Sequence, residues 1–429
     1  MLSNDFTPEP FWWQAAPRAE TTDAGDSTLP DEVDVLVIGS GYTGMHAALQ
    51  TARAGLGTLV VDADALGAGC SSRNGGQVST SVKGDFPGLV RQYGAEQSLA
   101  MLREGITALN FLEQFIQDEA IECEWCRSGH FSGAHNTSAY DAAARRLTAL
   151  PTELGIKWHM VPARDQHSEI GSDRYHGGVL YPDHGALQPA LYHAGLLSRV
   201  QAAGARTIGH CRVERLESLS AGFNVHTSLG TVRAGKVAIA TNGYTGPVSP
   251  WQQRRIIPIG SYMIATAPVA EGLAKEIAPR GRTMTDTRRL VFYYRMYERR
   301  MIFGGRVALS ETDPRVSAPR LHDAMSEIFP QLSSTPIDYS WLGFVGFTFD
   351  TLPHIGEQDG LHYAMGYCGS GISLSSYLGS IMGSQIAGDT ERRSAFMDLN
   401  FPTRPFYSGH PWFLKPSILY YKWRDRLNV

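Results

Sequence analysis

Two apolar runs near the start of the chain flank a segment with helical spacing. The first run, at 33–40, ends in glycines, and the second is GTLVVDAD at 57–64. Short uninterrupted apolar runs bounded by glycine are typical of buried strands. Between them, MHAALQTARAG repeats small and apolar residues with the period of a helix, and Gly55 stands where a C-cap is expected. The pattern predicts one β-α-β unit over residues 33–64.

The rest of the chain divides into helical and alternating segments. Apolar spacing predicts helices at 94–118, 138–150, 187–203 and 319–329. Strands are predicted at 212–218 and 223–228, antiparallel sheet at 255–310, and a strand, glycine turn and helix at 361–386. Residues 1–30 have no period and are predicted to form a surface arm pinned by Phe11, Trp12 and Trp13.

Composition and charge exclude several functional classes. The chain has 429 residues, 43% hydrophobic and 19% charged, which favours a globular protein of two or three domains. A net charge of −4 offers no electrostatic footprint for nucleic acid and no polybasic membrane anchor. No apolar run approaches the ~20 residues of a membrane span, and the N-terminus does not resemble a secretory signal. Five scattered cysteines favour reduced thiols in the cytoplasm, and no metal site is expected.

A glycine-rich turn after the first predicted strand has the pattern of a dinucleotide site. Gly39, Gly41 and Gly44 form G-x-G-x-x-G where the strand meets the helix. Such glycines permit a tight turn, a close approach to pyrophosphate and close helix packing, and the helix N-terminus attracts the phosphates. Asp62 ends the second strand, where an acid binds ribose hydroxyls. The alternative is a strand–helix corner that binds nothing.

Two further glycine-bearing segments suggest a flavin dinucleotide. GAGCSSRNGGQ at 67–77 offers backbone donors, and Arg73 and Asn74 add charge and hydrogen bonds. GYCGSGISLSSYLG at 366–379 runs from glycines into a helix, whose N-terminus would stabilise negative charge on a reduced flavin. The first segment could equally be a polar surface loop, and the second a well-capped helix start.

Together these motifs resemble the D-amino-acid oxidase superfamily of flavoenzymes, and within it the gamma-glutamylputrescine oxidase group. The resemblance runs nearly end to end. It includes FWWQAA, SDRYHGGVLYPDHGALQP at 172–189, ATNGY at 240–244, LVFYYRMYERRMIFGGR at 290–306, IDYSWLGFVGFTFDTLPHIG at 337–356 and the terminal YYKWRDRLNV.

The resemblance implies an α/β fold of glutathione-reductase-like topology. A Rossmann-type FAD-binding domain would be joined to an α+β substrate domain built on antiparallel sheet. We expect the FAD-binding domain to comprise 31–92, 172–250 and 340–429, and the substrate domain 93–171 and 251–339, after an arm at 1–30. The residues that would contact FAD are Gly39, Gly41, Gly44, Asp62, Ser71, Ser72, Arg73, Asn74, Gly75, Gln77, Val213, Thr241, Gly243, Gly369, Gly371, Ile372 and Ser373.

The implied activity is oxidation of an amine to an imine that hydrolyses to an aldehyde. A neutral amine held near the flavin gives up hydride directly, so the enzyme supplies positioning and excludes water. O2 or another acceptor would reoxidise the flavin, and a gamma-glutamylputrescine-like, polyamine or secondary amine is the expected substrate. Aromatic faces attract ammonium groups, so Tyr262, Tyr294 and Trp341 are candidate catalytic residues, with Tyr293 and Phe347 beside them; each could instead be a core residue.

Three departures from the superfamily pattern bear on the substrate and cofactor. Val345 stands where amino-acid oxidases carry a carboxylate-binding arginine, which favours an amine without an α-carboxylate unless Arg295, Arg300 or Arg306 substitutes. Ser370 replaces the histidine of a Gly-His-Gly turn. No cysteine lies between Cys211 and Cys368, so FAD is expected to be bound non-covalently.

Three alternatives remain open. The chain could be a sarcosine or amino-acid oxidase or dehydrogenase that binds carboxylate with another arginine. It could be a flavin-binding protein without turnover, since a fold does not fix a function. An NAD(P)-dependent dehydrogenase is less favoured, because it leaves the second and third glycine segments without a purpose.

Overall fold

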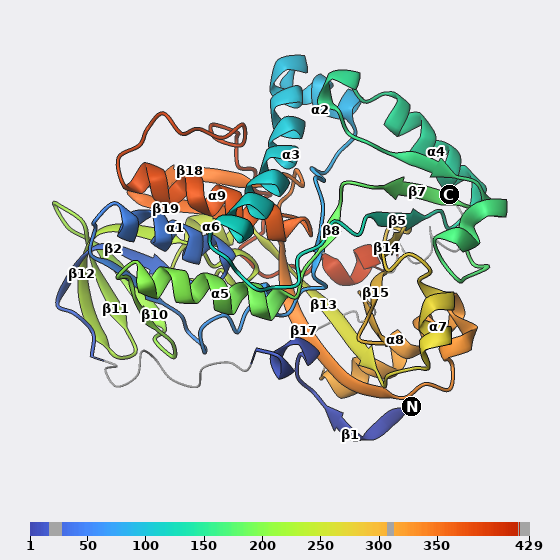
Figure 1. Cartoon of the computed structure of the whole chain (residues 1–429). Coiled ribbons are helices and arrows are strands. Elements are labelled where there is room, and N and C mark those ends of the chain that lie inside the picture. Colours follow the sequence, from blue (N-terminus) through green and yellow to red (C-terminus); the bar gives the residue numbers. More distant parts are fainter. Residues whose placement is uncertain (17–27, 307–312, 419, 421–429) are drawn as a thin grey trace.

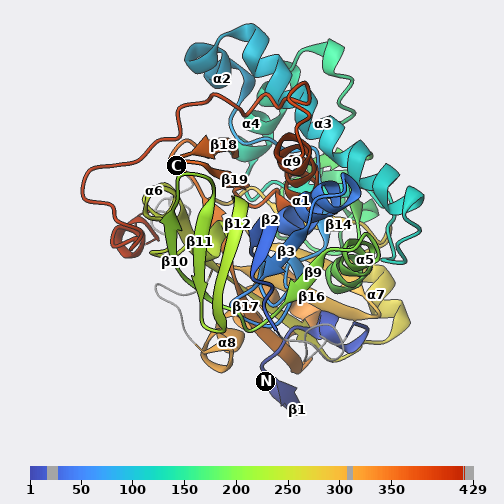
Figure 2. The same cartoon turned by 90° about the vertical axis from the view of Figure 1, so that its left-hand side faces the viewer.

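The computed structural model describes residues 1–16, 28–306, 313–418 and 420, which form two lobes that each contain a large β-sheet (Figure 1). Helices α1 (Tyr42–Arg53), α5 (Pro189–Ala202) and α9 (Gly371–Ile386) lie along the first sheet, on the left in Figure 1. The turned view in Figure 2 shows these helices on one side of that sheet. This arrangement supports the predicted α/β class with a Rossmann-type lobe.

The first sheet has eight strands in the order β10-β11-β12-β2-β3-β9, and β19 pairs with both β12 and β18. The strands are β2 (Glu32–Ile38), β3 (Thr58–Val61), β9 (Arg206–Ile208), β10 (Val213–Ser218), β11 (Phe223–Thr227), β12 (Gly230–Ile239), β18 (His354–Gln358) and β19 (Leu361–Met365). β12, β2, β3 and β9 are parallel, and β3 and the C-terminal parts of β2 and β12 are buried, which is why these stretches are apolar. The predicted β-α-β unit is confirmed as β2, α1 and β3.

The second sheet has nine strands in the order β1-β17-β13-β16-β15-β14-β5-β7-β6. They are β1 (Leu2–Thr7), β5 (His130–Gly133), β6 (His159–Val161), β7 (Gly178–Tyr181), β13 (Ile257–Thr266), β14 (Thr283–Asp286), β15 (Tyr293–Tyr297), β16 (Arg300–Gly305) and β17 (Ile337–Phe347). The antiparallel sheet predicted at 255–310 is confirmed through residue 305, with α7 (Glu271–Ile277) inserted, and residues 307–310 lie outside the described ranges. β4 (Gln77–Val78) and β8 (Gly185–Ala186) form a separate two-stranded ladder between the lobes.

The other helices lie close to their predicted positions. α3 (Ala95–Asp118) and α4 (Thr137–Thr148) match the helices expected at 94–118 and 138–150. α8 (Pro314–Ile328) begins earlier than the predicted 319, because Asp313 caps its start by accepting a hydrogen bond from the Arg315 N–H. α2 (Phe86–Tyr93) was not predicted, since its short length gives little periodicity.

The N-terminal arm is partly a strand, which corrects the prediction of a surface arm without regular structure. β1 pairs in parallel with β17 and extends the nine-stranded sheet by one edge strand. The hydrogen bonds between neighbouring strands join backbone groups. A polar segment can therefore pair with an open sheet edge even though its apolar residues do not alternate. Phe11, Trp12 and Trp13 are buried, as predicted, in a short helical turn. Residues 17–27 lie outside the described ranges.

Strand pairing refines the proposed division into two domains. β7 lies in the segment 172–250 assigned to the FAD-binding domain, yet it pairs with β5 in the nine-stranded sheet. β17 crosses the proposed boundary at residue 340 and also belongs to that sheet. We keep the two-domain division as a proposal, with both strands assigned to the substrate domain.

Helices α1 and α9 touch backbone to backbone at two glycines. A Cβ on Gly379 would lie 2.8 Å from the Thr43 Cα, and one on Gly383 would lie 2.7 Å from the Ala47 Cα. Such a close approach is possible only without side chains at the crossing. Thr43 lies in the first turn of α1 and Gly379 near the middle of α9, so the start of α1 packs against the middle of α9 and the α9 N-terminus extends beyond it.

We predict that Gly379→Ala lowers the free energy of unfolding by about 1–3 kcal/mol, because the added methyl forces two backbones apart. Gly272→Ala in α7 is the matched control, because a Cβ there meets no atom within 4 Å. That variant should be stabilised by about 0.5–1 kcal/mol, the difference in helix propensity between glycine and alanine. Urea denaturation of both proteins measures the change, and equal behaviour of the two variants would contradict the prediction.

Candidate functional site

The turn between β2 and α1 needs its three glycines for different reasons. Gly39 has a φ of +106°, and a Cβ on it would lie 2.9 Å from the Ala240 carbonyl oxygen. A Cβ on Gly41 would lie 2.9 Å from the Ser71 Oγ, and one on Gly44 would overlap the Gly39 carbonyl. The turn is therefore tight, packed against its own helix and crossed by a second segment, as the motif predicts.

Asp62 lies beside this turn, at the end of β3. Its Oδ2 accepts hydrogen bonds from the Ser40 N–H at 2.8 Å and from the Ser40 hydroxyl at 2.6 Å, and its Oδ1 accepts from the Asp64 N–H. A carboxylate has about four lone-pair sites, so acceptor capacity is left for ribose hydroxyls. Val213 lies near this end of the site, because the Cys211 N–H donates to the Asp62 carbonyl.

The segment 67–77, here called the cofactor loop, crosses the N-terminus of α1. The Ser71 Oγ accepts a hydrogen bond from the Tyr42 N–H at 3.0 Å. Ser72 is buried, and its hydroxyl donates to the Gly67 carbonyl, so its side chain serves the loop itself. Asn74 Oδ1 accepts from the Gly76 N–H, which shapes the last turn. The loop is therefore folded against the phosphate-binding position and is not a free surface loop.

Three indole N–H groups hold the middle of the cofactor loop. Trp13 donates to the Ser72 hydroxyl at 2.9 Å, Trp341 to the Arg73 carbonyl at 2.7 Å and Trp12 to the Asn74 carbonyl at 2.8 Å. The Arg73 guanidinium lies 4.6 Å from the Trp13 ring, and it donates to the Ala68 and Leu342 carbonyls. The Ser72 side chain and the backbone of residues 73 and 74 are thus held by groups from two distant parts of the chain.

The late turn, residues 366–371, has room beside it. A Cβ on Gly369 would meet no atom within 4 Å, and one on Gly371 would meet only the Tyr367 Cβ at 3.8 Å. Open space next to a helix N-terminus leaves room for a ligand. The Ile372 and Ser373 side chains are buried, and the Ser373 hydroxyl donates to the Ser79 carbonyl, so these two residues can meet a ligand only through their backbone.

The segment 241–243 links the late turn to the rest of the site. The Asn242 Oδ1 accepts from the Gly366 N–H at 2.9 Å. A Cβ on Gly243 would lie 2.6 Å from the Phe344 carbonyl of β17, so this glycine is required by packing. Thr43 near the start of α1 shares a 2.7 Å hydrogen bond with the Tyr367 hydroxyl of the late turn. The three glycine-bearing segments therefore converge on one place.

Several side chains near these segments are partly exposed to solvent, although burial shifts their pKa values. Cys70 is half-buried, and burial raises the pKa of its thiol to about 11. Tyr244 is 43% exposed, yet burial raises the pKa of its phenol. Lys83 is exposed, and burial lowers the pKa of its ammonium group. Cys70 and Tyr244 border the same part of the cofactor loop, since a Cβ on Gly69 would lie 3.4 Å from the Tyr244 ring.

The predicted aromatic residues do not all face the cofactor loop, because side chains alternate between the two faces of the second sheet. Tyr262 and Tyr294 lie in the core between the sheet and α8, and the Tyr294 hydroxyl bonds the Tyr175 hydroxyl at 2.6 Å. Successive residues of a strand face opposite sides, so Tyr293 faces the cofactor loop instead, and its ring borders Gly75. Trp341 does face the loop, but its indole binds loop backbone. Tyr262 and Tyr294 are therefore not positioned to contact a ligand there.

Two of the arginines considered as carboxylate ligands have structural partners. Arg300 forms an ion pair with Asp338 at 2.5 Å and donates to the Thr266 carbonyl. Arg295 is buried between the rings of Trp12 and Tyr297, and its guanidinium points to the Gly76 carbonyl at 3.4 Å. Arg306 is half-buried at the end of β16. Arg295 and Arg300 thus brace the cofactor loop and the N-terminal arm.

Sequence reasoning missed a group of rings beside the segment that follows the cofactor loop, where the Thr80 hydroxyl bonds the His184 Nε2. His184 and Tyr181 stack with centroids 4.9 Å apart, and His130 lies 5.8 Å from His184. Burial lowers the pKa of His130 to about 3 and that of His184 to about 4, so both imidazoles are neutral at neutral pH. Gln77, the last residue of the cofactor loop, contacts β14 and β15, because its side-chain amide donates to the Met284 and Tyr294 carbonyls. The sequence YPDH gave no periodic signal for this group.

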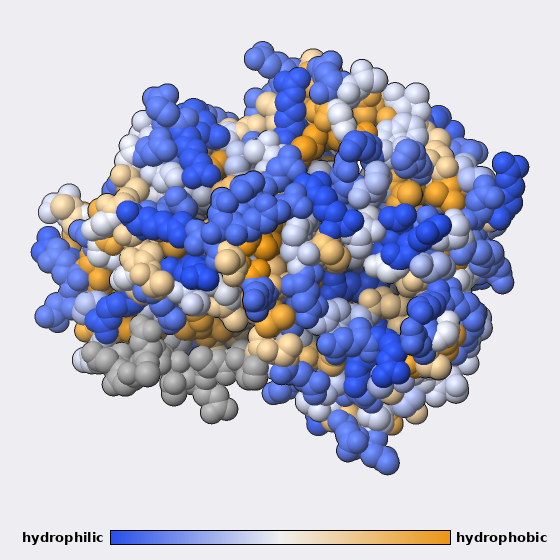
Figure 3. Space-filling view, in the orientation of Figure 1, coloured by the Kyte–Doolittle hydropathy of each residue, from blue (hydrophilic) through white to orange (hydrophobic). Residues whose placement is uncertain are grey.

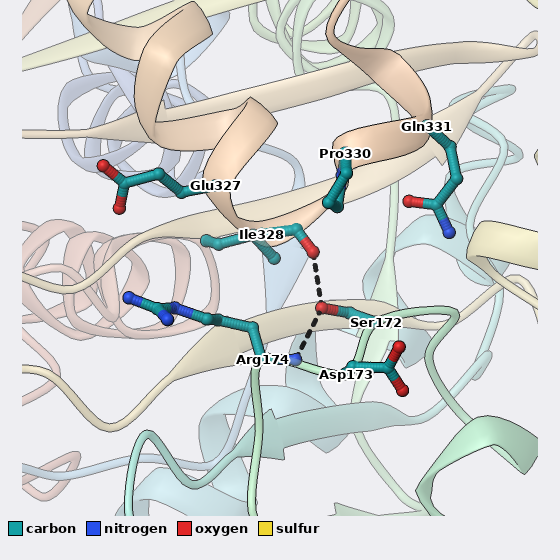
Figure 4. Close-up of a pocket in the computed structure, with 7 residues that line it drawn as sticks. All are labelled: Ser172, Asp173, Arg174, Glu327, Ile328, Pro330 and Gln331. Atoms are coloured by element: carbon teal, nitrogen blue, oxygen red, sulfur yellow. Dashed lines mark hydrogen bonds between the residues drawn. The ribbon is translucent and has the colours of Figure 1, made fainter.

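A shallow hollow of about 410 Å³ lies elsewhere on the second lobe (Figure 4). It is lined by Ser172, Asp173, Arg174, Glu327, Ile328, Pro330 and Gln331. The Ser172 hydroxyl donates to the Ile328 carbonyl there and accepts from the Arg174 N–H. None of these residues belongs to the cofactor loop or the late turn, so the hollow is separate from the candidate site.

Polar and apolar side chains are interspersed on the face shown in Figure 3, without a continuous apolar band. In the part of the chain that the structure describes, no helix has the length and apolar character needed to cross a membrane.

The residues fit a flavin dinucleotide. The tight first turn and the N-terminus of α1 suit a pyrophosphate, and Asp62 suits a ribose. The late turn leaves open space at Gly369, as a ring system beside the α9 N-terminus requires. A nicotinamide dinucleotide would use the first of these features but not the last.

Comparisons with known proteins agree with this geometry. The DAO family model, described as FAD dependent oxidoreductase, matches residues 34–385. Gamma-glutamylputrescine oxidoreductase of Escherichia coli is 30% identical over 92% of this chain and 93% of its own length. L-proline dehydrogenase from P. horikoshii has a TM-score of 0.71 at 16% identity, covering 91% of this chain and 99% of that one. Glycine oxidase from Geobacillus kaustophilus also has a TM-score of 0.71, at 17% identity and with coverages of 88% and 99%.

We predict that Trp341→Phe weakens FAD binding roughly tenfold. The variant keeps the aromatic packing but leaves the Arg73 carbonyl without its donor, at a cost of about 1–3 kcal/mol. Titration of the apoprotein with FAD, followed by fluorescence, measures the dissociation constant. Trp412→Phe is the control, because Trp412 is 61% exposed and remote from the loop contacts. Unchanged affinity in Trp341→Phe would show that the indole bond does not position the loop.

We also predict that His184 lowers the free energy of unfolding as the pH falls below neutrality. An unfolded histidine binds its proton near pH 6.5, whereas in the native state His184 does so only near pH 4. Between these values the unfolded chain binds more protons, so the free energy of unfolding falls as the pH falls, by up to about 3 kcal/mol.

Urea unfolding from pH 7 to pH 4.5 measures this dependence. In His184→Gln the decrease should be smaller than in the wild type, because the titrating imidazole is gone. His167→Gln is the control, since His167 is exposed, and it should keep the wild-type slope. Identical slopes in all three proteins would refute the assignment.

Proposed function

The chain belongs to the DAO family of FAD-dependent oxidoreductases, and from that premise we propose that it oxidises an amine whose reacting carbon bears no carboxylate, with O2 as electron acceptor. It is an FAD-dependent amine oxidoreductase. In this proposal the amine becomes an imine, which water hydrolyses to an aldehyde, and O2 becomes H2O2. We propose that the FAD is held non-covalently.

The residues proposed to hold FAD are those of the first turn, the cofactor loop and the late turn. Gly39, Gly41 and Gly44 would admit the pyrophosphate, Asp62 the ribose, and the backbone around Gly369 the ring system. When bound, FAD supplies the acceptor for a hydride from the carbon next to nitrogen. The protein's part is to position the amine and keep water away.

The observation that carries the proposal is the aliphatic side chain at position 345. β17 pairs with β13 in regular antiparallel register across this stretch, so Val345 lies on the same face as Trp341 and Gly343. That face borders the cofactor loop, since a Cβ on Gly343 would lie 3.1 Å from the Cys70 Sγ. A carboxylate clamp needs a guanidinium. An isopropyl group at this position supports a substrate without a carboxylate on the reacting carbon.

Tyr293 is the aromatic residue we propose for the amine end of the substrate. Its ring borders Gly75 of the cofactor loop, and its hydroxyl bonds the Ser261 hydroxyl at 2.6 Å, which fixes the ring. Burial raises the pKa of its phenol, so the side chain is uncharged at neutral pH. A neutral aromatic face attracts an ammonium group before it loses its proton.

The similarity to gamma-glutamylputrescine oxidoreductase, 30% over 92% of the chain, supports an amide-linked polyamine as substrate. A sarcosine, glycine or proline oxidase and a protein without turnover are the competing outcomes of the test. We keep the cytoplasm as the proposed compartment, because five cysteines without a pairing pattern are typical of a reducing environment.

We predict that gamma-glutamylputrescine reduces the bound flavin under anaerobic conditions, with loss of the absorbance band near roughly 450 nm, and that air restores it. Sarcosine, glycine and proline should leave the band unchanged. Reduction by these three compounds but not by the polyamine would overturn the proposed substrate class. Reduction by none of the amines would overturn turnover itself, and a band that air does not restore would exclude O2 as the acceptor.

The matched variants for this experiment are Tyr293→Leu and Tyr294→Phe. Loss of the aromatic face in Tyr293→Leu should raise the amine concentration needed for half-maximal reduction by about fivefold or more. Tyr294→Phe, on the opposite face of the sheet, should reduce at the wild-type concentration.

A further inference from the structure

Thr285 of β14 lies beside Tyr293 on the face of the second sheet that borders the cofactor loop. The two residues are direct partners in the antiparallel pairing of β14 with β15, and direct partners share a face. The Gln77 amide of the loop donates to the backbone carbonyls of Met284 and Tyr294, which flank this pair. Thr285 is half-buried, whereas Met284 is fully buried, so the Thr285 side chain is open to a ligand on this face.

The imidazole of His130 in β5 is held between two threonine hydroxyls of β14. Its Nδ1 lies 2.9 Å from the Thr283 Oγ1, and its Nε2 lies 2.9 Å from the Thr285 Oγ1. The Thr283 hydroxyl also donates to the Gly129 carbonyl at 3.4 Å. Burial lowers the pKa of His130 to about 3, so the ring is neutral at neutral pH and has one donor and one acceptor nitrogen.

Only one arrangement of hydrogens makes all three bonds at once. A hydroxyl has a single hydrogen, and Thr283 uses its own on the Gly129 carbonyl. The His130 Nδ1 must then donate to the Thr283 oxygen, which leaves the Nε2 as the acceptor of the Thr285 hydroxyl. The reverse arrangement would lose the bond to Gly129. The hydrogen of Thr285 is therefore engaged, and its oxygen offers only lone pairs to a ligand.

An oxygen that can only accept suits an N–H group. Tyr293, the direct neighbour of Thr285, is uncharged and presents an aromatic face, which attracts an ammonium group. A primary or secondary amine carries an N–H both as an ammonium group and after it loses a proton. The Thr285 oxygen can therefore hold the nitrogen in both states and leave the lone pair of the neutral amine unengaged.

We propose that the Thr285 hydroxyl oxygen accepts a hydrogen bond from the nitrogen of the substrate, and that His130 and Thr283 are positioning residues that fix the direction of this hydroxyl. The inference rests on the proposed function and identifies the group that recognises the reacting amine. It also predicts discrimination, because a ligand with only an acceptor at that position would meet the lone pairs of Thr285.

The first test follows reduction of the flavin by gamma-glutamylputrescine in the FAD-loaded full-length protein under anaerobic conditions. Thr285→Val keeps the shape of the side chain but removes the acceptor, so it should raise the half-maximal amine concentration about tenfold and leave the limiting rate unchanged. Thr285→Ser restores the hydroxyl and should stay within about twofold of the wild type. An unchanged half-maximal concentration in Thr285→Val overturns the proposal.

The matched control is Thr231→Val. Thr231 is also a strand threonine whose hydroxyl bonds a histidine, His226, at 3.1 Å, but it is exposed on the β11–β12 hairpin of the other lobe. This variant should reduce with the wild-type concentration dependence.

The second test reads the direction of the hydroxyl through Thr283→Val. Without the Thr283 oxygen both tautomers of His130 become accessible, and Thr285 can turn its hydrogen to the ligand. The probe is gamma-glutamylputrescine with a methoxy group in place of its terminal amino group, an acceptor that cannot reduce the flavin. Its dissociation constant, measured from the perturbation of the flavin spectrum, should fall about threefold or more in Thr283→Val, while the half-maximal concentration of the amine rises. Changes of the same sign for both ligands would indicate a merely structural role and overturn the proposal.

The outcomes separate this inference from the proposed function. If the amine binds but does not reduce the flavin, the proposed function fails, and the dissociation constants of amine and ether in the same variants still decide the role of Thr285. If the amine reduces the flavin equally well in Thr285→Val, the function stands and the inference is wrong. Absence of amine binding to the wild type overturns both.

Discussion

The site depends on the fixed backbone of residues 72–74. Indole N–H groups from Trp12, Trp13 and Trp341 bind this stretch, and they come from two parts of the chain that are distant in sequence. The first two belong to the N-terminal arm, which is held in turn by the pairing of β1 with β17. The cofactor loop is therefore bound to the edge of the second sheet while it lies across the α1 N-terminus of the first. Because the loop is common to both lobes, the cofactor position and the substrate wall cannot shift independently.

The pleat then decides which side chains of the second sheet can meet a ligand. Tyr293 and Tyr294 are adjacent and chemically identical, yet Tyr293 borders Gly75 and Tyr294 packs behind the sheet. The same alternation along β17 sets Val345 on the face of the cofactor loop. Register therefore places an aliphatic group, and not a guanidinium, at position 345 on the face of β17 that borders the cofactor loop.

The sequence predicted the parts of the site that depend on local structure. The first turn, Asp62 and the α9 N-terminus follow from glycine and apolar spacing within about thirty residues of chain or less. The choice between Tyr293 and Tyr294 was not predictable, because two adjacent tyrosines carry no alternation, and the covered face is set by α8, a distant segment. The strand at Leu2–Thr7 was missed because its bonds are made by the backbone to an edge elsewhere in the fold.

The side chains that β15 and β17 turn towards the cofactor loop bear on the proposed substrate. Trp341 and Val345 of β17 share the face that borders the loop, and Tyr293 of β15 reaches Gly75. The imidazoles of His130 and His184 are neutral at neutral pH, because burial lowers their pKa values. An aromatic face attracts an ammonium group, whereas a guanidinium at position 345 would attract a carboxylate. We therefore propose that these residues favour an amine over an amino acid at the reacting carbon.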